Sequence, residues 1–428
     1  MIISITLAIL LALLVLSVPV AAALIVLGLS LGELFSDFPL YRVIGEISWS
    51  ASTDFLLLSI PLFVMLGEIL LRAGIAKKTY NALNSWLSWL PGGLLQANIG
   101  TSALFAATSG SSVATAATIT TVALPQGRRY NYSEKLFAGS IAAGGTLGIL
   151  IPPSINLIVY GFLTNTSIPR LFLAGIVPGI LLALLFMLCL AVACALNPKL
   201  SGGKSEVTWR ERFETLKDLI PVLVIFVVVI GSIYAGLATP TESAALGVLA
   251  SLLLALRYRA VNIEFFKQVF EGTIRTSSMI MLILISANFL NFILDSIGLA
   301  ETLYQFVNTL GASPLNTLIV VILLYVVLGF FVETLSLMVI TVPIIAPILV
   351  NLGYDPIWFG ILLILLIEMA LITPPVGLNL YVVQGVRRSG SIVDVMVGAF
   401  PFVIMIALMI ILLIIFPEIA LYATQFVN

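Results

Sequence analysis

The chain has 428 residues, of which 61% are hydrophobic and 9% charged, and its formal net charge is −1. Soluble domains carry about 25% charged residues, so this composition excludes an ordinary soluble protein. No basic stripe points to nucleic acid as a partner. The lack of His, with only two Cys, excludes a Ser-His-Asp triad and a Cys/His transition-metal cluster. We therefore expect an all-α polytopic membrane protein that is not an enzyme.

The chain begins with an apolar segment over residues 2–29. It lacks a basic start and is too long for a signal peptide, so we predict a retained first helix. A second apolar segment covers 54–71, and an amphipathic arm follows over about 72–90. The segment 93–125 is long enough for two half-length helices but short for two crossings, and its middle is rich in small and hydroxylated residues. We predict that it forms a re-entrant hairpin.

A broken helix is predicted over 135–163, because Pro152-Pro153 interrupts an otherwise apolar segment. Proline has no backbone N–H and therefore cannot continue the helical hydrogen-bond ladder. Two apolar segments, 170–196 and 219–237, then lead into the second half of the chain.

The second half repeats this order of elements and ends in one further helix. Its predicted segments are two crossing helices (240–256 and 276–295), an arm (about 298–311), a hairpin (314–350), a broken helix (355–386) and a last helix (392–416). The prolines repeat as well. Pro347 precedes the proline pair at 374–375 at the spacing at which Pro125 precedes the pair at 152–153. Matched spacing in both halves indicates a duplication.

The elements divide the chain into two repeats. The predicted parts are a first repeat over 1–163, a two-helix linker over 164–239, a second repeat over 240–386 and a C-terminal helix over 387–428. With a cytoplasmic N-terminus and a periplasmic C-terminus, every Lys and Arg except Arg42 and Arg170 lies on the cytoplasmic side. The repeats are then inverted. Inverted repeats with interrupted helices place substrate and coupling-ion sites near the middle of the membrane.

The interruptions carry oxygen ligands without net charge. Hydroxyl groups gather at the tip of the first hairpin, and Gly and Pro at each break release main-chain carbonyls. Such oxygens suit Na⁺, while the N-termini of the restarting helices and of the second hairpin arms suit a carboxylate. Helix packing is the alternative explanation for the small residues of Ala114–Thr121. Glu333, at the second tip, is either a functional acid or a helix cap.

Three strings of residues stand out for their length and their order. They are Ala142–Ile155, Thr239–Ala245 and Leu371–Asn379. Together they resemble the large membrane subunit of tripartite ATP-independent periplasmic (TRAP) transporters, the DctM-like family. The resemblance implies a Na⁺-coupled secondary transporter of the bacterial inner membrane that takes a small organic anion from a periplasmic binding protein. It also implies a smaller four-helix membrane subunit as partner, an elevator mechanism, and no cofactor besides the coupling ion Na⁺.

The resemblance also implies two Na⁺ sites and no transition metal. The first would comprise Ser109, Ser111, Ser112, Gly144, Gly145, Thr146 and Pro152. The second would comprise Thr334, Ser336, Thr373, Pro374 and Gly377. We further expect substrate contacts from Ser112, Ser154, Asn156 and Asn379.

The expected substrate is a carboxylate. Resemblance to the sialic acid branch makes sialic acid the first candidate, and a C4-dicarboxylate or another sugar or keto acid is the alternative. A stand-alone anion symporter or a cation/proton antiporter is the remaining alternative to a tripartite system.

Overall fold

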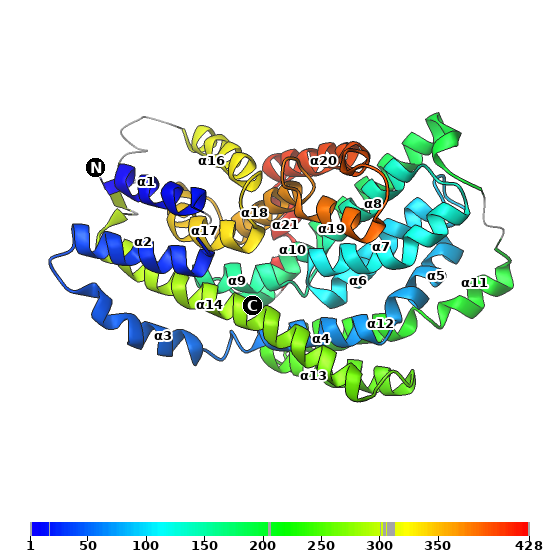
Figure 1. The fold of residues 1–428 in the computed structure, drawn as a ribbon, viewed down its shortest axis with the longest axis horizontal. Coiled ribbons are helices and arrows are strands. Elements are labelled where there is room, and N and C mark those ends of the chain that lie inside the picture. The colour runs from blue at the N-terminus through cyan, green and yellow to red at the C-terminus, as the bar shows by residue number, and fades with distance from the viewer. Residues whose placement is uncertain are drawn as a thin grey trace.

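The computed structural model describes residues 2–16, 18–203, 207–299, 301, 302, 305 and 313–426. The described residues form helices joined by short connections, in an elongated body whose helices run mainly along its long axis (Figure 1). Six of these helical spans are long and apolar enough to cross a membrane, and the pair formed by α4 and α5, bent by 70°, is a seventh if it counts as one span. The predicted all-helical membrane fold is confirmed.

The N-terminal segment differs from the prediction. The single helix predicted over 2–29 is wrong, because the structure has two helices there, α1 (Ile2–Val15) and α2 (Val20–Phe35). The break falls just before Pro19, whose ring removes an N–H donor and disfavours helical backbone at the preceding residue. Each helix is shorter than the ~20 residues that a crossing needs, so the side of the membrane on which the N-terminus lies stays a prediction.

Short helices then lead to the first hairpin. They are the 3-10 turn η1 (Leu40–Val43), α3 (Ile44–Ser52), α4 (Ser59–Arg72) and α5 (Ile75–Leu87). Gly74 has φ = +70°, a left-handed conformation that lets the chain turn sharply between α4 and α5. Helix α5 covers the predicted arm of 72–90 and buries one face, which includes Ile75 and Tyr80.

The first hairpin and the first broken helix form where the sequence predicts them. The hairpin consists of α6 (Leu94–Ser109) and α7 (Ser112–Arg129), joined by Gly110 and Ser111. The broken helix consists of α8 (Glu134–Thr146), the 3-10 turn η2 (Leu147–Ile149) and, beyond Pro152-Pro153, α9 (Ile155–Thr164). Re-entry of the hairpin into a membrane stays a prediction.

The middle of the chain contains α10 (Ile168–Leu196), η3 (Pro198–Leu200), α11 (Trp209–Leu216), α12 (Ile220–Tyr234), α13 (Pro240–Arg257) and α14 (Ile263–Ser296). Of these, α10 and α14 are the two longest helices among the described residues. The arm predicted over about 298–311 lies largely outside the described residues.

The second hairpin and second broken helix repeat the order of the first. They are α16 (Pro314–Gly329) with α17 (Thr334–Asn351), and α18 (Pro356–Leu371) with α19 (Leu378–Arg387). The chain ends with α20 (Ile392–Ile415), α21 (Glu418–Leu421) and the turn η4 (Ala423–Phe426). The equivalent order agrees with the predicted duplication, while inversion across a membrane stays a prediction.

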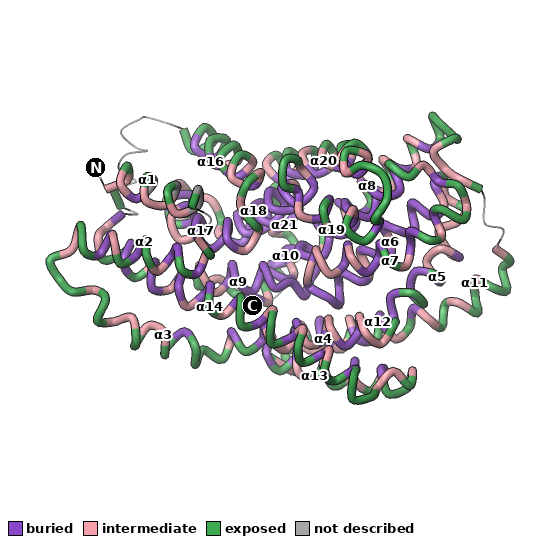
Figure 2. The backbone as a smooth tube through the Cα atoms, in the orientation of Figure 1, coloured by how far each residue is buried: buried purple, intermediate pink, exposed green. Residues whose placement is uncertain are grey.

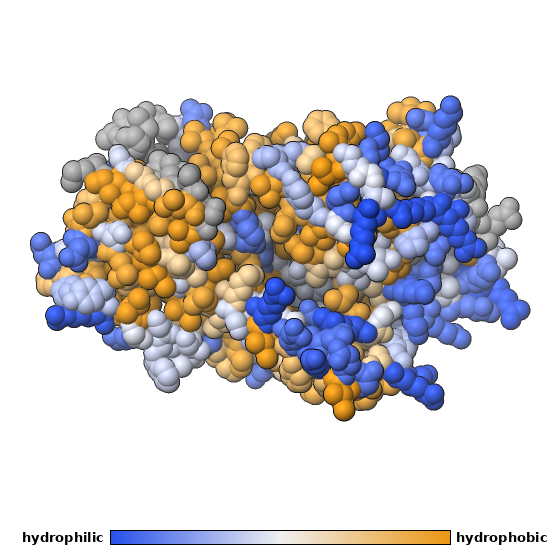
Figure 3. All heavy atoms as spheres, in the orientation of Figure 1, coloured by the Kyte–Doolittle hydropathy of each residue, from blue (hydrophilic) through white to orange (hydrophobic). Residues whose placement is uncertain are grey.

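The core lies around α8 and α18, which are buried along most of their length (Figure 2). Helix α8 packs against α20, α7 and α6, and the first hairpin also packs against α19. The second hairpin packs against α18 and α9. Hydrophobic atoms cover much of the outer face, whereas hydrophilic atoms gather at the end that holds α5 and α11 (Figure 3). A surface with this apolar cover suits a lipid bilayer.

Candidate functional site

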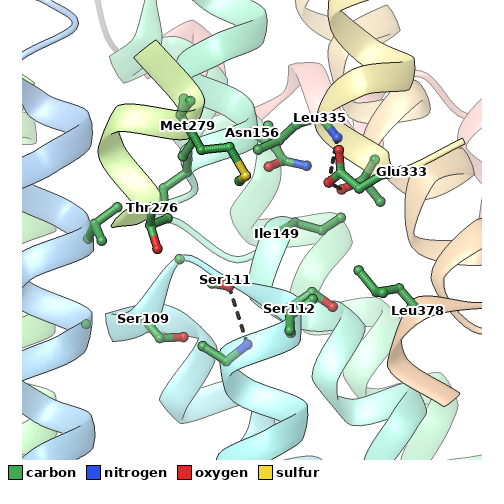
Figure 4. Close-up of a pocket in the computed structure, with 18 of the residues that line it drawn as sticks. Ser109, Ser111, Ser112, Ile149, Asn156, Thr276, Met279, Glu333, Leu335 and Leu378 are labelled. Carbon is green, nitrogen blue, oxygen red and sulfur yellow. Dashed lines mark hydrogen bonds between the residues drawn. The ribbon is translucent and has the colours of Figure 1, made fainter. Parts of the chain in front are cut away.

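A cavity of about 700 Å³ lies between the tips of the two hairpins. One wall is the first tip with the start of α7, and the facing wall is Glu333–Ser336 at the start of α17 (Figure 4). The starts of α9 and α19 contribute Asn156 and Leu378, and α2, α4 and α14 form a third wall. The fold therefore brings the tips of both predicted hairpins to one place, although they lie far apart in the sequence.

Four helix N-termini meet at this cavity. Residues at the starts of α7, α9, α17 and α19 all line it, while none of the lining residues that the structure describes is Lys or Arg. A helix N-terminus presents unpaired N–H groups and the positive end of the helix dipole, so each can attract an anion. Attraction for a carboxylate at this site therefore comes from backbone and hydroxyl donors and not from basic side chains.

Glu333 occupies one of these N-termini with its own carboxylate. Its oxygens accept hydrogen bonds from the backbone N–H groups of Leu335 and Ser336 at 3.1 and 3.0 Å. They also accept bonds from the hydroxyls of Thr334 and Ser336, each at 2.9 Å. Glu333 is therefore the N-cap of α17, and it leaves the starts of α7 and α9 as the better positions for a substrate anion. Its negative charge favours a cation beside Thr334 and Ser336.

Asn156 points a free donor into the cavity. The residue is 4% exposed, and its Nδ2 has no hydrogen-bond partner in the described structure. It lies in the first turn of α9, on the cavity wall between the two tips (Figure 4). A buried N–H group without a partner is costly, so this amide is suited to an acceptor atom of a ligand. Its predicted contact with substrate agrees with this placement.

The structure brings the residues of the first predicted Na⁺ site together. The Ser109 and Thr115 hydroxyls lie 2.9 Å apart across the tip. The tip packs so closely on the first broken helix that a Cβ added at Gly148 would lie 2.7 Å from the Ser111 carbonyl oxygen. One added at Gly145 would lie 2.7 Å from Ala116 Cβ. Glycine at these positions permits the contact between the tip and the break.

The other members of that set belong to the same buried region. Thr146 donates its hydroxyl proton to the Ala143 carbonyl at 2.8 Å, and Pro152 is buried in the break itself. A Cβ added at Gly144 would lie 2.7 Å from Ser102 Oγ, which has no hydrogen-bond partner in the described residues. Ser102 is thus an oxygen that sequence reasoning missed, because a lone Ser in an apolar helix carries no distinguishing pattern.

Two residues expected to contact substrate form hydrogen bonds with other protein groups instead. Asn379 donates to the Ser112 hydroxyl at 2.8 Å and to the Ala142 carbonyl at 3.1 Å, which ties α19 to the first hairpin and to α8. Ser154 caps α9 and donates to the Ile149 carbonyl at 2.5 Å. The cavity lining includes Ser112 and Asn156 but neither Asn379 nor Ser154, so contact of these last two with substrate stays a prediction.

The residues predicted to form the second Na⁺ site do not all lie at the cavity. Thr334 and Ser336 line the cavity, whereas Thr373, Pro374 and Gly377 are not among its lining residues. Thr373 donates to the Met369 carbonyl at 2.5 Å, and Pro374 is exposed. The first break is buried throughout, because the first hairpin covers it, while the prolines of the second break are uncovered. The two predicted Na⁺ sites therefore differ in how far their residues are brought together in this conformation.

The third wall of the cavity was not assigned from sequence. It includes Glu68 on α4 and Thr276 with Met279 on α14. Glu68 is paired with Arg72 at 3.0 Å, which neutralises its charge beside the cavity. The run of hydroxyl residues that begins at Thr276 in an apolar helix is a signal that would have indicated this wall.

Hairpins and broken helices that meet around one cavity are the architecture of a secondary transporter. The chain belongs to the family described as "Tripartite ATP-independent periplasmic transporter, DctM component", whose model matches residues 7–419. It is therefore a multi-pass membrane permease component, as the resemblance implies.

Individual relatives carry different substrate names. The chain is 35% identical to the C4-dicarboxylate TRAP transporter large permease protein DctM of Pseudomonas aeruginosa, over 79% of each chain. It is 32% identical to the sialic acid TRAP transporter large permease protein SiaM of Vibrio cholerae, over 94% of this chain and 92% of that one. The crystal structure of the Alcanivorax borkumensis YdaH transporter has the same fold, with a TM-score of 0.62, 16% identity, and coverage of 95% of this chain and 98% of that one.

Proposed function

We propose that this chain is the large membrane subunit of a Na⁺-coupled importer of a small organic anion in the bacterial inner membrane. The observation that carries this proposal is the cavity at which four helix N-termini and both hairpin tips meet without a basic side chain. Helix N-termini supply partial positive charge, and bound Na⁺ would supply the rest. Binding of the organic anion would then depend on bound Na⁺.

Each of the two Na⁺ ions would bind between a hairpin tip and the neighbouring break in a helix. The oxygens of Ser109–Ser112 and of the first break would hold one Na⁺. Thr334 and Ser336, beside the Glu333 carboxylate, would hold the other together with Thr373 and the carbonyls of the second break. In this conformation the second set is divided, so its ion would bind as the second hairpin tip moves onto the second break.

We propose an elevator mechanism for the movement. The hairpins and broken helices would move as one body against a scaffold that includes α2, α4 and α14. The Asn379 bonds to Ser112 and Ala142 support this division, because they join the two halves inside the moving body. Since the family is described as tripartite and periplasmic, we propose a small membrane subunit and a periplasmic binding protein as the other two components.

The substrate we propose is a carboxylate, with sialic acid as the first candidate. The cavity of about 700 Å³ has room for an acid of that size, and its mainly apolar lining includes hydroxyl groups at both hairpin tips that could bind a polyhydroxylated acid. A C4-dicarboxylate is the second candidate, supported by the 35% identity to a relative named for that substrate.

The test is uptake in proteoliposomes that contain this chain, the small subunit and the binding protein. Labelled sialic acid or a labelled C4-dicarboxylate should accumulate only with an inward Na⁺ gradient and with the binding protein present. Asn156→Leu should lower apparent substrate affinity by about 10- to 100-fold, because a hydrogen bond to a charged group contributes about 1.5–3 kcal/mol. Asn316→Leu, on the exposed face of α16, is the control. Equal uptake without a Na⁺ gradient would refute the coupling.

A further inference from the structure

Glu368 lies in the last turn of α18 and is fully buried, with 0% of its surface exposed. Neither of its carboxylate oxygens has a hydrogen-bond partner in the described structure. Other acids are accommodated differently: Glu333 and Glu242 cap helices, and Glu134 pairs with Arg387. The proposed transport function uses no property of Glu368, so its burial needs another explanation.

An ionised carboxylate at this position is opposed by two separate effects. Transfer of an unpaired charge from water to an apolar interior is far more costly than transfer of a neutral polar group. In addition, the C-terminal turn of a helix is the negative end of its dipole, which repels a second negative charge. Glu368 belongs to that turn, since α18 ends at Leu371. The carboxyl group must therefore be neutral or hold a cation.

The surroundings favour a proton over a metal ion. Na⁺ needs several oxygen ligands, whereas Glu368 lines neither the cavity between the hairpin tips nor the smaller pocket on α14 and α17. Its flanking residues on α18 are aliphatic, from Ile364 to Ile367. Glu368 lies two turns after Ile361, a residue that packs near Gly175, so it shares the face of α18 that contacts α10. A proton needs only the carboxyl oxygen itself.

Among the described residues, no basic group on the neighbouring helices forms a hydrogen bond or an ion pair with this carboxylate. Tyr160 on α9 donates to the Pro356 carbonyl, and Tyr325 on α16 shares a hydrogen bond with Thr341. Arg387 on α19 pairs with Glu134 and Asp394. The remaining titratable or charged groups on packed elements, which form no bond to Glu368 within the described residues, are Lys135, Arg170, Cys189, Cys194, Glu333, Tyr381 and Glu418.

We infer that Glu368 is a proton-binding site of the transporter, protonated in this conformation and able to release its proton through the second break. The nearest exposed residues that follow Glu368 in the chain are Pro374–Val376, at the second break. The inference therefore places the exchange of the proton with water at this break. Only the O–H bond breaks and re-forms, and the proton passes to and from water. The inference adds a titrating site to the transport cycle and does not rest on Na⁺ coupling.

The first test labels the wild-type transporter with dicyclohexylcarbodiimide, a reagent that adds to protonated carboxyl groups in apolar surroundings. Mass spectrometry of the assembled complex should find the adduct on Glu368 at neutral pH and less of it as the pH rises. Glu242, an exposed acid in a capping box, should stay unlabelled. Absence of the adduct at both acid and neutral pH would overturn the inference.

The second test compares Glu368→Gln with Glu242→Gln in the three-component proteoliposomes. The inference predicts that the uptake rate of the wild type depends on pH. Glutamine keeps the shape of the side chain but cannot titrate, so this dependence should be lost in Glu368→Gln and kept in Glu242→Gln. Glu368→Asp should restore it. A wild-type pH profile in Glu368→Gln would refute the inference, and the labelling decides if that variant does not fold. Na⁺ dependence measured at one fixed pH tests the proposed function separately.

Discussion

At the scale of single residues, most polar groups around the cavity already have a local structural role. Ser111 caps α7, Ser154 caps α9 and Glu333 caps α17. A cap satisfies backbone N–H groups that the helix cannot satisfy itself. The Asn156 amide is different, because its donor has no partner within the described part of the chain. A mutational test at this site must therefore separate loss of a cap from loss of a ligand.

Ser111→Ala makes that separation. The Ser111 hydroxyl accepts a hydrogen bond from the Ala114 N–H, so the change should cost about 1 kcal/mol of stability through the cap alone. If Ser111 also binds Na⁺, the Na⁺ concentration for half-maximal uptake should rise. Ser313→Ala removes a similar cap, from α16, and should leave that concentration unchanged. Equal Na⁺ dependence in both variants would show that Ser111 is only a cap.

At the scale of elements, close packing without side chains fixes the position of the first broken helix. Helices α8 and α20 cross at Gly139 and Gly398, where a Cβ added to Gly398 would lie 1.9 Å from the Lys135 carbonyl oxygen. Small residues let membrane helices approach in this way. The same reasoning applies to Gly145, where any side chain would displace the first hairpin and would test packing more than ion binding.

Gly398→Ala should therefore destabilise the protein by about 1–3 kcal/mol or more, since overpacking forces the two backbones apart. Thermal unfolding of the detergent-solubilised subunit measures the effect. Gly385→Ala is the matched control, because a Cβ there meets nothing within 4 Å and helical Ala is favoured over Gly by about 0.5–1 kcal/mol. If both variants melt like the wild type, the α8–α20 crossing is looser than described.

At the scale of the whole molecule, a charged cluster joins the ends of four helices. Arg387 at the end of α19 has a side chain that is 2% exposed, and it contacts Glu134 at the start of α8 and Asp394 at the start of α20. Arg128 at the end of α7 donates to Ser389 and to the Arg387 carbonyl. The cluster therefore links the first hairpin, the first broken helix and the C-terminal part of the chain.

Arg387→Met should weaken this linkage, because it leaves two carboxylates without their buried partner. Removing one member of a buried ion pair typically costs about 3–5 kcal/mol, and the partial exposure of Glu134 and Asp394 places the expected loss at or below the lower end. A lower melting temperature with unchanged substrate affinity is expected. Arg388→Met, at an exposed neighbouring position, should have little effect. Similar melting of both variants would argue against a structural cluster.

The sequence determined the features that depend on a residue's own neighbours. Apolar segments fixed the helical membrane fold, and Pro152-Pro153 and Pro374-Pro375 marked both breaks because proline acts on its own helix. The hairpin turn at Gly110 followed from the local run of small residues. The same rule applied at Pro19 would have divided the first helix correctly.

Only the tertiary structure decided which of these local features meet. Asn379 reaches Ser112 across 267 residues of sequence, and no neighbour that the structure describes accepts a hydrogen bond from the Asn156 amide. The first break is covered and the second is not, although their sequences are alike. Burial and hydrogen-bond partners depend on how distant helices pack, and a local pattern does not contain that information.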